Sequence, residues 1–96
     1  MVKTNQQIEY NNRIIKMPFK IPNQDLSIER FVVVNEYSDE KTYLPRFAVA
    51  VFNTIKQQER IANNDYLLQS AAIGNMRKGL DWFQRYFVNE YYTLLD

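Results

Sequence analysis

The sequence predicts a small α+β fold. A small N-terminal antiparallel β-sheet, made of a hairpin and one further strand, packs against two or three C-terminal α-helices. The chain has 96 residues, 46% of them hydrophobic, including one Trp, seven Tyr and six Phe, which suits a single domain with a packed core. Residues 6–37 are rich in β-type patterns, whereas residues 45–96 carry apolar side chains at helical spacing. Two glycines and three prolines leave little of the chain for irregular loops.

Residues 6–20 predict the hairpin. Ile8 and Tyr10 alternate with polar residues, and Asn11-Asn12 can adopt the positive φ of a tight turn before the chain returns. One face of the returning strand would carry Arg13, Ile15, Met17 and Phe19. Pro18 cannot donate to a β-ladder, so we expect this strand to be at an edge or bulged there. The polar residues 1–5 are expected to be frayed.

Residues 27–37 (SIERFVVVNEY) predict the further strand, with a helix as the alternative. Ile28, Phe31 and Val32 fit a helical stripe, but three consecutive valines lose side-chain freedom in a helix and suit a pleated surface. A polar turn is expected over residues 38–41.

Pro45 predicts the start of a helix over residues 45–62, because its ring fixes the φ of a first helical turn. The buried face of this helix would carry Phe47, Ala48, Val51, Phe52, Ile55 and Ala62. Asn64 is expected to cap a short helix over residues 65–73. Gly74 would then either end or kink the helical path before a long helix over residues 76–94.

The last predicted helix has an unusually broad apolar surface. Its main stripe consists of Met76, Leu80, Phe83, Phe87, Tyr91 and Leu94, and Trp82 and Tyr86 widen it on one flank. A surface helix needs an apolar sector of little more than ~100°, so the excess predicts a contact with another molecule. In the alternative interpretation this helix crosses the middle of the domain and is covered by the hairpin and by residues 45–62.

The absence of His and Cys excludes most common catalytic and metal chemistry. Ser-His-Asp and Cys-His catalysis and His or Cys metal sites are impossible, and a domain of this size has little room for a pocket. Gly74 and Gly79 resemble the ends of a phosphate-binding loop, but Leu80-Asp81 replaces the required Lys and Ser/Thr. We therefore expect no enzyme, no cofactor and no metal.

The charge pattern leaves nucleic-acid binding as the second hypothesis. The net charge of +1 is too small to indicate a polyanionic partner by itself. Residues 1–22, however, contain four basic residues against one acidic residue, and residues 23–41 contain two against five. Phosphates could be contacted by the hairpin residues Arg13, Lys16 and Lys20, or by Lys56 and Arg60 on the helix over residues 45–62.

The sequence thus predicts a small, non-catalytic, cytoplasmic binding or regulatory protein that acts through a protein surface. Its partner would be another protein or a second copy in a homodimer, with no membrane involved. Compact chains rich in Asn and Tyr are typical of phage and mobile-element products that inhibit host proteins. The expected interface residues lie on the last helix: Trp82, Phe83, Tyr86, Phe87, Tyr91 and Tyr92. On this hypothesis Trp82→Ala would weaken association more than it unfolds the chain.

Overall fold

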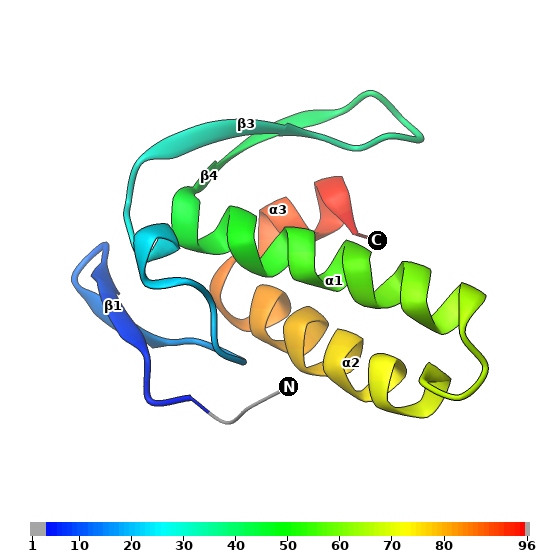
Figure 1. Cartoon of the computed structure of the whole chain (residues 1–96). Helices are drawn as coiled ribbons and strands as arrows, with labels where there is room; N and C mark the ends of the chain where they lie inside the picture. The colour runs from blue at the N-terminus through cyan, green and yellow to red at the C-terminus, as the bar shows by residue number, and fades with distance from the viewer. Residues whose placement is uncertain (1–3, 96) are drawn as a thin grey trace.

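A computed structural model describes residues 4–95 as two β-hairpins followed by three helices, which confirms the predicted α+β class (Figure 1). The prediction of a frayed start concerns residues 1–5, of which 1–3 lie outside the described range. The strands are β1 (Gln7–Tyr10), β2 (Arg13–Lys16), β3 (Arg30–Val34) and β4 (Lys41–Pro45), with a short 3-10 turn at Asn23–Asp25. The helices are α1 (Arg46–Asn64), α2 (Gln69–Tyr86) and α3 (Val88–Leu94).

The first hairpin forms where the sequence predicts it. β1 pairs antiparallel with β2, with Ile8 opposite Ile15, and the turn residues Asn11 and Asn12 have φ values of 52° and 62°. Positive φ at both turn positions matches the right-handed twist of the strands, and Asn tolerates it well. The return strand is shorter than predicted because it ends at Lys16, before Pro18. The chain then curves beneath the domain and buries Met17, Phe19 and Ile21.

The second hairpin corrects the prediction of one further strand. Residues 30–34 are extended as expected. Their partner is β4, whose residues run from the end of the predicted polar turn over residues 38–41 to the predicted start of the helix at Pro45. The molecule therefore has two separate two-stranded sheets. β4 has only five residues and runs directly into α1, so no alternation long enough to predict a strand is present.

The first helix agrees closely with its predicted range and face. Pro45 precedes α1 as its cap, with φ −67° and ψ 155°, so it is the last residue of β4 and not part of the first helical turn. Arg46 at the start of the helix is bound by Asp25, at 3.1 Å, and by Glu29, at 3.8 Å. All six predicted core positions are buried: Phe47, Ala48, Val51, Phe52, Ile55 and Ala62.

The boundaries predicted for the later helices are wrong. α2 runs through Gly74 without interruption, and the break comes instead at Phe87, whose φ of −139° and ψ of 58° end the helix. Gly74 faces open space, so nothing in its surroundings requires a bend there. Asn64 does not cap the next helix but closes α1, while the Asp65 side chain accepts hydrogen bonds from the turn that leads into α2.

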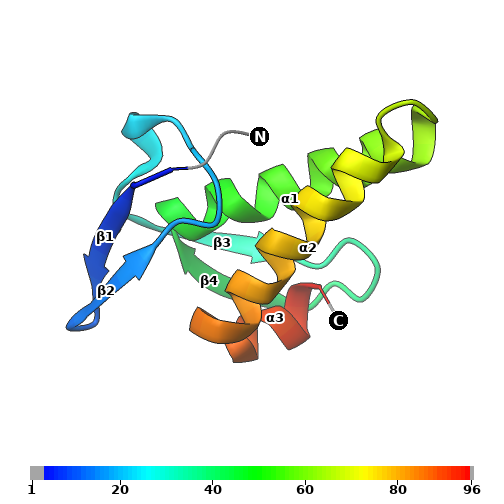
Figure 2. The same ribbon diagram turned by 90° about the horizontal axis from the view of Figure 1, so that it is seen from below.

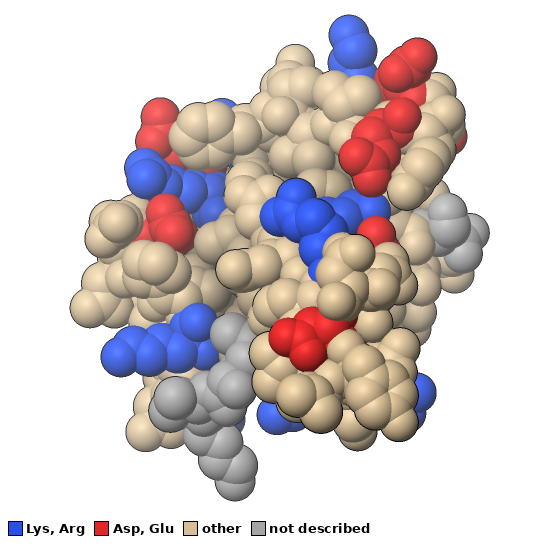
Figure 3. Space-filling model, turned by 45° about the vertical axis from the view of Figure 1, so that its right-hand side comes forward, with Lys and Arg blue, Asp and Glu red and all other residues tan. Residues whose placement is uncertain are grey.

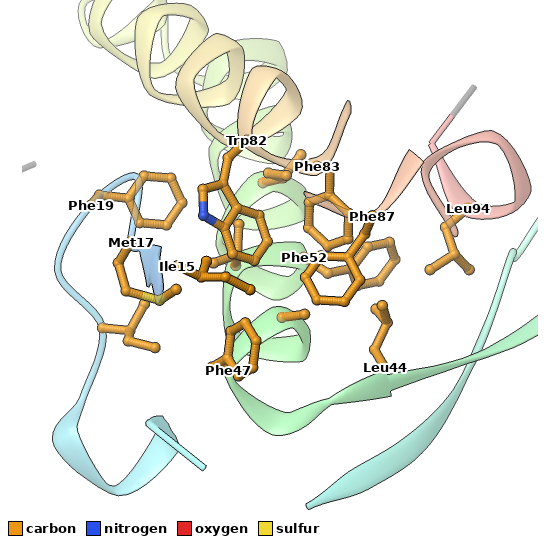
Figure 4. Packing of buried hydrophobic residues seen from close by; sticks show 14 residues of the cluster. Ile15, Met17, Phe19, Leu44, Phe47, Phe52, Trp82, Phe83, Phe87 and Leu94 are labelled. Carbon is orange, nitrogen blue, oxygen red and sulfur yellow. The ribbon is translucent and has the colours of Figure 1, made fainter. Parts of the chain in front are cut away.

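The core lies between the helices and the two hairpins (Figure 4). α1 and α2 run side by side, and α1 also contacts β3 and β4 (Figures 1 and 2). The two helices approach closely at Gly79, where a Cβ atom would stand 2.5 Å from Cγ1 of Ile55. The glycine therefore allows the helix pair to approach closely, and the hairpins cover the sides that the helices leave open.

Candidate functional site

Trp82, the first of the predicted interface anchors, lies in the core. Its side chain is 5% exposed, and its Nε1 donates a hydrogen bond of 2.8 Å to the carbonyl oxygen of Lys16. Its ring contacts Phe47 of α1 and the neighbouring Phe83 and Phe87, which are also buried (Figure 4). These three rings are therefore not exposed for a contact, because the β2 segment and α1 cover them, as in the alternative interpretation of this helix.

The remaining aromatic residues of this region are only partly available. Tyr86 is half-buried, and the guanidinium of Arg13 lies over its ring at 5.0 Å. Tyr91 is also half-buried and meets Tyr92 edge-on at 5.5 Å. Tyr92 is 61% exposed. Only one of the six predicted interface residues is thus fully on the surface.

The basic residues of the N-terminal hairpin meet basic residues of α2. Lys16 lines a surface groove together with Lys78 and Arg85, and Asp81 is the acidic residue among them. Arg13 adjoins this groove through its contact with Tyr86, which also lines it. Lys20 is exposed but does not line this groove.

Lys56 and Arg60, the other predicted phosphate contacts, have acidic neighbours. Lys56 is half-buried, with its Nζ 3.9 Å from Oε1 of Glu36. Glu59 lines the same depression as Lys56 and Arg60. Because these carboxylates offset the positive charge, this part of α1 is a poor phosphate-binding surface.

Exposed apolar side chains occur at the turn between α1 and α2. Tyr66 and Leu67 are each 88% exposed, and Leu68 is 51% exposed. Figure 3 shows that uncharged residues dominate this end, whereas acidic side chains gather where the β3–β4 turn projects. In this turn, Asp65 accepts hydrogen bonds from the N–H groups of Leu67 and Leu68.

The β3–β4 hairpin also has an apolar outer face. Residues paired in register share a face, so Val32 lies beside Tyr43 on one side, and Phe31 lies beside the fully buried Leu44 on the other. Val32 is 50% exposed and Tyr43 is 59% exposed. The guanidinium of Arg30 lies 5.5 Å from the Tyr43 ring and borders this apolar pair.

The hydrogen-bond pattern leaves one edge of β3 open. Arg46 N–H donates to Glu29, and Asn35 N–H donates to Glu40, so the odd-numbered residues of β3 face β4. The N–H and C=O groups of the three even-numbered residues therefore point away from β4. Among residues 4–95, no backbone bond outside the strand pairing satisfies them. These residues are Arg30, Val32 and Val34.

The opposite edge of this hairpin is closed. Pro45 stands opposite Arg30 in a pair that makes no mutual hydrogen bonds, so its missing N–H would lie on the outer edge of β4. α3 contacts β4, and in Figure 2 β4 lies between β3 and α3. Of the two edges of this hairpin, only that of β3 can therefore accept a further strand.

A shallow groove runs beside the open edge. Phe31, which is 40% exposed, forms one wall, and Val49, Ala50 and Asn53 of α1 form the floor. Asp25, Glu29 and Arg46 also line the groove. We call the open backbone groups of β3 and this groove together the β3 edge site.

The β3 edge site was not predicted from the sequence. The run RFVVV carried a usable signal, because a strand without proline or an internal charge lacks the usual protection of an edge. Its exposure depended on β4 and α3, and neither the pairing nor the docking could be predicted from local pattern.

The described part of the chain contains neither a group of side chains placed to hold a metal ion nor a helix able to cross a membrane. Within residues 4–95, no group of three acidic, His or Cys side chains is placed to hold a metal ion. The helices in this range lack the length and apolar character needed to cross a membrane.

Comparison of the chain with protein-family models, curated proteins and solved structures finds no match.

Proposed function

We propose that this chain is a small, non-catalytic protein-binding protein and that the β3 edge site is its binding surface. The observation that supports this most directly is the open edge of β3, with apolar side chains on both faces. Phe31, Val32 and Val34 are 40%, 50% and 44% exposed. Exposed apolar surface joined to unpaired backbone groups is typical of a place where another chain binds.

The proposed function class is the one predicted from the sequence, but the binding surface is the β3 edge site and not the last helix. The predicted anchors Trp82, Phe83 and Phe87 serve the core. The exposed aromatic and aliphatic groups of the β3–β4 hairpin take their place, with Tyr43 beside the edge. Tyrosine suits such a position because its ring excludes water from a contact while its hydroxyl stays hydrated.

Nucleic-acid binding is the second candidate, and one observation favours it. Lys16, Lys78 and Arg85 come from two different elements and line one groove. Asp81 offsets part of their charge, and the whole chain carries a net charge of only +1. We expect this groove to give weak binding that salt easily reverses.

One experiment separates the two candidates. The purified chain is screened against a displayed peptide library, and it is titrated with labelled DNA and RNA oligonucleotides between about 50 and 200 mM salt. We expect enriched peptides whose affinity changes little with salt. Tight nucleic-acid binding that falls steeply with salt, without enriched peptides, would reject protein binding in favour of the second candidate.

Two variants locate the surface used by the enriched peptides. Val32→Lys places a charge at the centre of the open edge, and charged edge residues oppose strand pairing. Tyr66→Ser removes an aromatic residue at the α1–α2 turn that is more exposed than Val32, 88% against 50%. Peptides that bind the β3 edge site should lose affinity for the first variant only. The reverse result would place the binding surface at the helical turn.

A further inference from the structure

We propose that the partner supplies an extended segment that adds to β3 as a third strand of the β3–β4 sheet. This inference rests on the proposed function and specifies how the β3 edge site recognises its ligand. Arg30, Val32 and Val34 each offer one N–H and one C=O on the open edge. Alternate residues of a strand lie about 7 Å apart, and the backbone of another extended chain repeats at the same spacing.

The groove restricts the side chains of the added segment. Side chains pointing inward from it would lie over Val49 and Ala50 and against Phe31. This floor is shallow, with Val49 and Ala50 as its apolar part and Asn53 as its polar part, so it suits valine, threonine or alanine at alternate positions better than large or charged residues. Arg46 is already bound by Asp25 and Glu29, which leaves one surplus negative charge among the residues that line the groove; the guanidinium of Arg30, at the same end of β3, lies over the Tyr43 ring instead. A lysine or arginine at that end of the segment would complement it.

A second copy of this chain fits the β3 edge site poorly. In Figure 2, α1 lies on the side of β3 away from β4, so it extends beneath the space beside the open edge. If two copies paired through their β3 strands, these two strands would lie only about 4.8 Å apart. Both α1 helices would then lie in the same space beneath the paired strands. Packed helices need about 8–10 Å between their axes. The occupant is therefore a segment of another protein that brings no helix beneath the sheet.

The test uses the full chain and a short blocked peptide in which valine alternates with threonine, with lysine at one end. Titration followed by amide NMR should slow hydrogen exchange at Arg30, Val32 and Val34. These amides should exchange quickly in the free protein, unlike those of Phe31 and Val33, which face β4. A peptide methylated on alternate backbone nitrogens, so that its edge donors are lost, should bind at least about tenfold more weakly.

The matched protein variants are Val32→Pro and Val32→Thr. Proline at this position removes a donor from the open edge without removing a bond to β4, so the hairpin should remain folded. Peptide affinity should fall about tenfold or more for Val32→Pro and stay within about threefold for Val32→Thr, which keeps the N–H and the β-branched shape.

Three results would overturn strand addition. The first is no slowing of exchange at the even-numbered amides of β3 at millimolar peptide. The second is equal binding of the methylated peptide. The third is unchanged affinity of a folded Val32→Pro variant. If Val32→Pro fails to fold, the exchange pattern of the unmodified protein decides the question. Library peptides that bind another surface would reject strand addition while leaving protein binding intact.

Discussion

Gly79 is the residue on which the close contact of α1 and α2 depends. A Cβ atom there would stand 2.5 Å from Cγ1 and 2.8 Å from Cδ1 of Ile55, which is 1% exposed. Since Ile55 is enclosed by the core, it cannot move aside without displacing other residues.

We predict that Gly79→Ala destabilises the protein by about 1–2 kcal/mol. Overpacking should outweigh the gain of about 1 kcal/mol that alanine brings to a helix. Gly74→Ala is the matched control in the same helix, because a Cβ atom there meets nothing within 4 Å. The control should stabilise the protein by about 0.5–1 kcal/mol in chemical unfolding experiments. Equal effects of the two substitutions would contradict the close contact.

Trp82 is a core residue, so its substitution should act on stability. We predict that Trp82→Ala lowers the free energy of unfolding by about 3–5 kcal/mol, because it leaves a cavity among Phe47, Phe83 and Phe87. Trp82→Phe keeps an aromatic ring but loses the hydrogen bond to Lys16, so its cost should be smaller. Thermal and chemical denaturation measure the stability of both variants. An unchanged melting temperature for Trp82→Ala would mean that this side chain lies on the surface and not in the core.

The connection between α1 and α2 depends on Asp65. Oδ1 of Asp65 accepts hydrogen bonds from the N–H groups of Leu67 at 3.0 Å and Leu68 at 3.3 Å. Leu68 directly precedes α2 and offers no capping side chain of its own. This carboxylate therefore satisfies two backbone donors in the turn that leads into the helix.

We predict that Asp65→Ala costs about 0.5–2 kcal/mol, because it removes the acceptor of two hydrogen bonds in the turn. Asp65→Asn keeps an acceptor oxygen in the same place and should retain most of the stability. Denaturant titration compares the two variants. A cost for Asn equal to that for Ala would mean that the negative charge, and not the hydrogen bonds, matters here.

At the scale of elements, prediction succeeded where a pattern is long or a turn has specific chemistry. α1 supplies both a long apolar period and Pro45 as a start signal, and Asn11-Asn12 provides the positive φ of the first turn. Prediction failed for β4, which has five residues, and at Gly74, where a possible glycine C-cap suggested an end or a kink of the helix. The actual break at Phe87 accompanies burial of its ring, which is a property of the tertiary structure.

The whole molecule should behave as a single chain in solution. Its Cα radius of gyration is 13.2 Å, close to the value expected for a folded domain of about 100 residues. Three of the six rings predicted to form the interface, Trp82, Phe83 and Phe87, are enclosed within the chain, and α1 hinders self-pairing at β3. We predict a mass of 11.5 kDa by light scattering. A stable mass equal to two chains would contradict this prediction. The exposed Tyr66 and Leu67 would then be the first candidates for the dimer contact.

The sequence by itself determined the α+β class, the nature of the long elements and the buried face of α1, because these follow from periodicity within one segment. Only the tertiary structure decided that Trp82 is covered, that Gly79 is a contact point and that β3 keeps an open edge. Each of these depends on which distant segment lies against the residue. Local pattern shows that a side chain is apolar, but only the packed chain determines whether its own residues cover it.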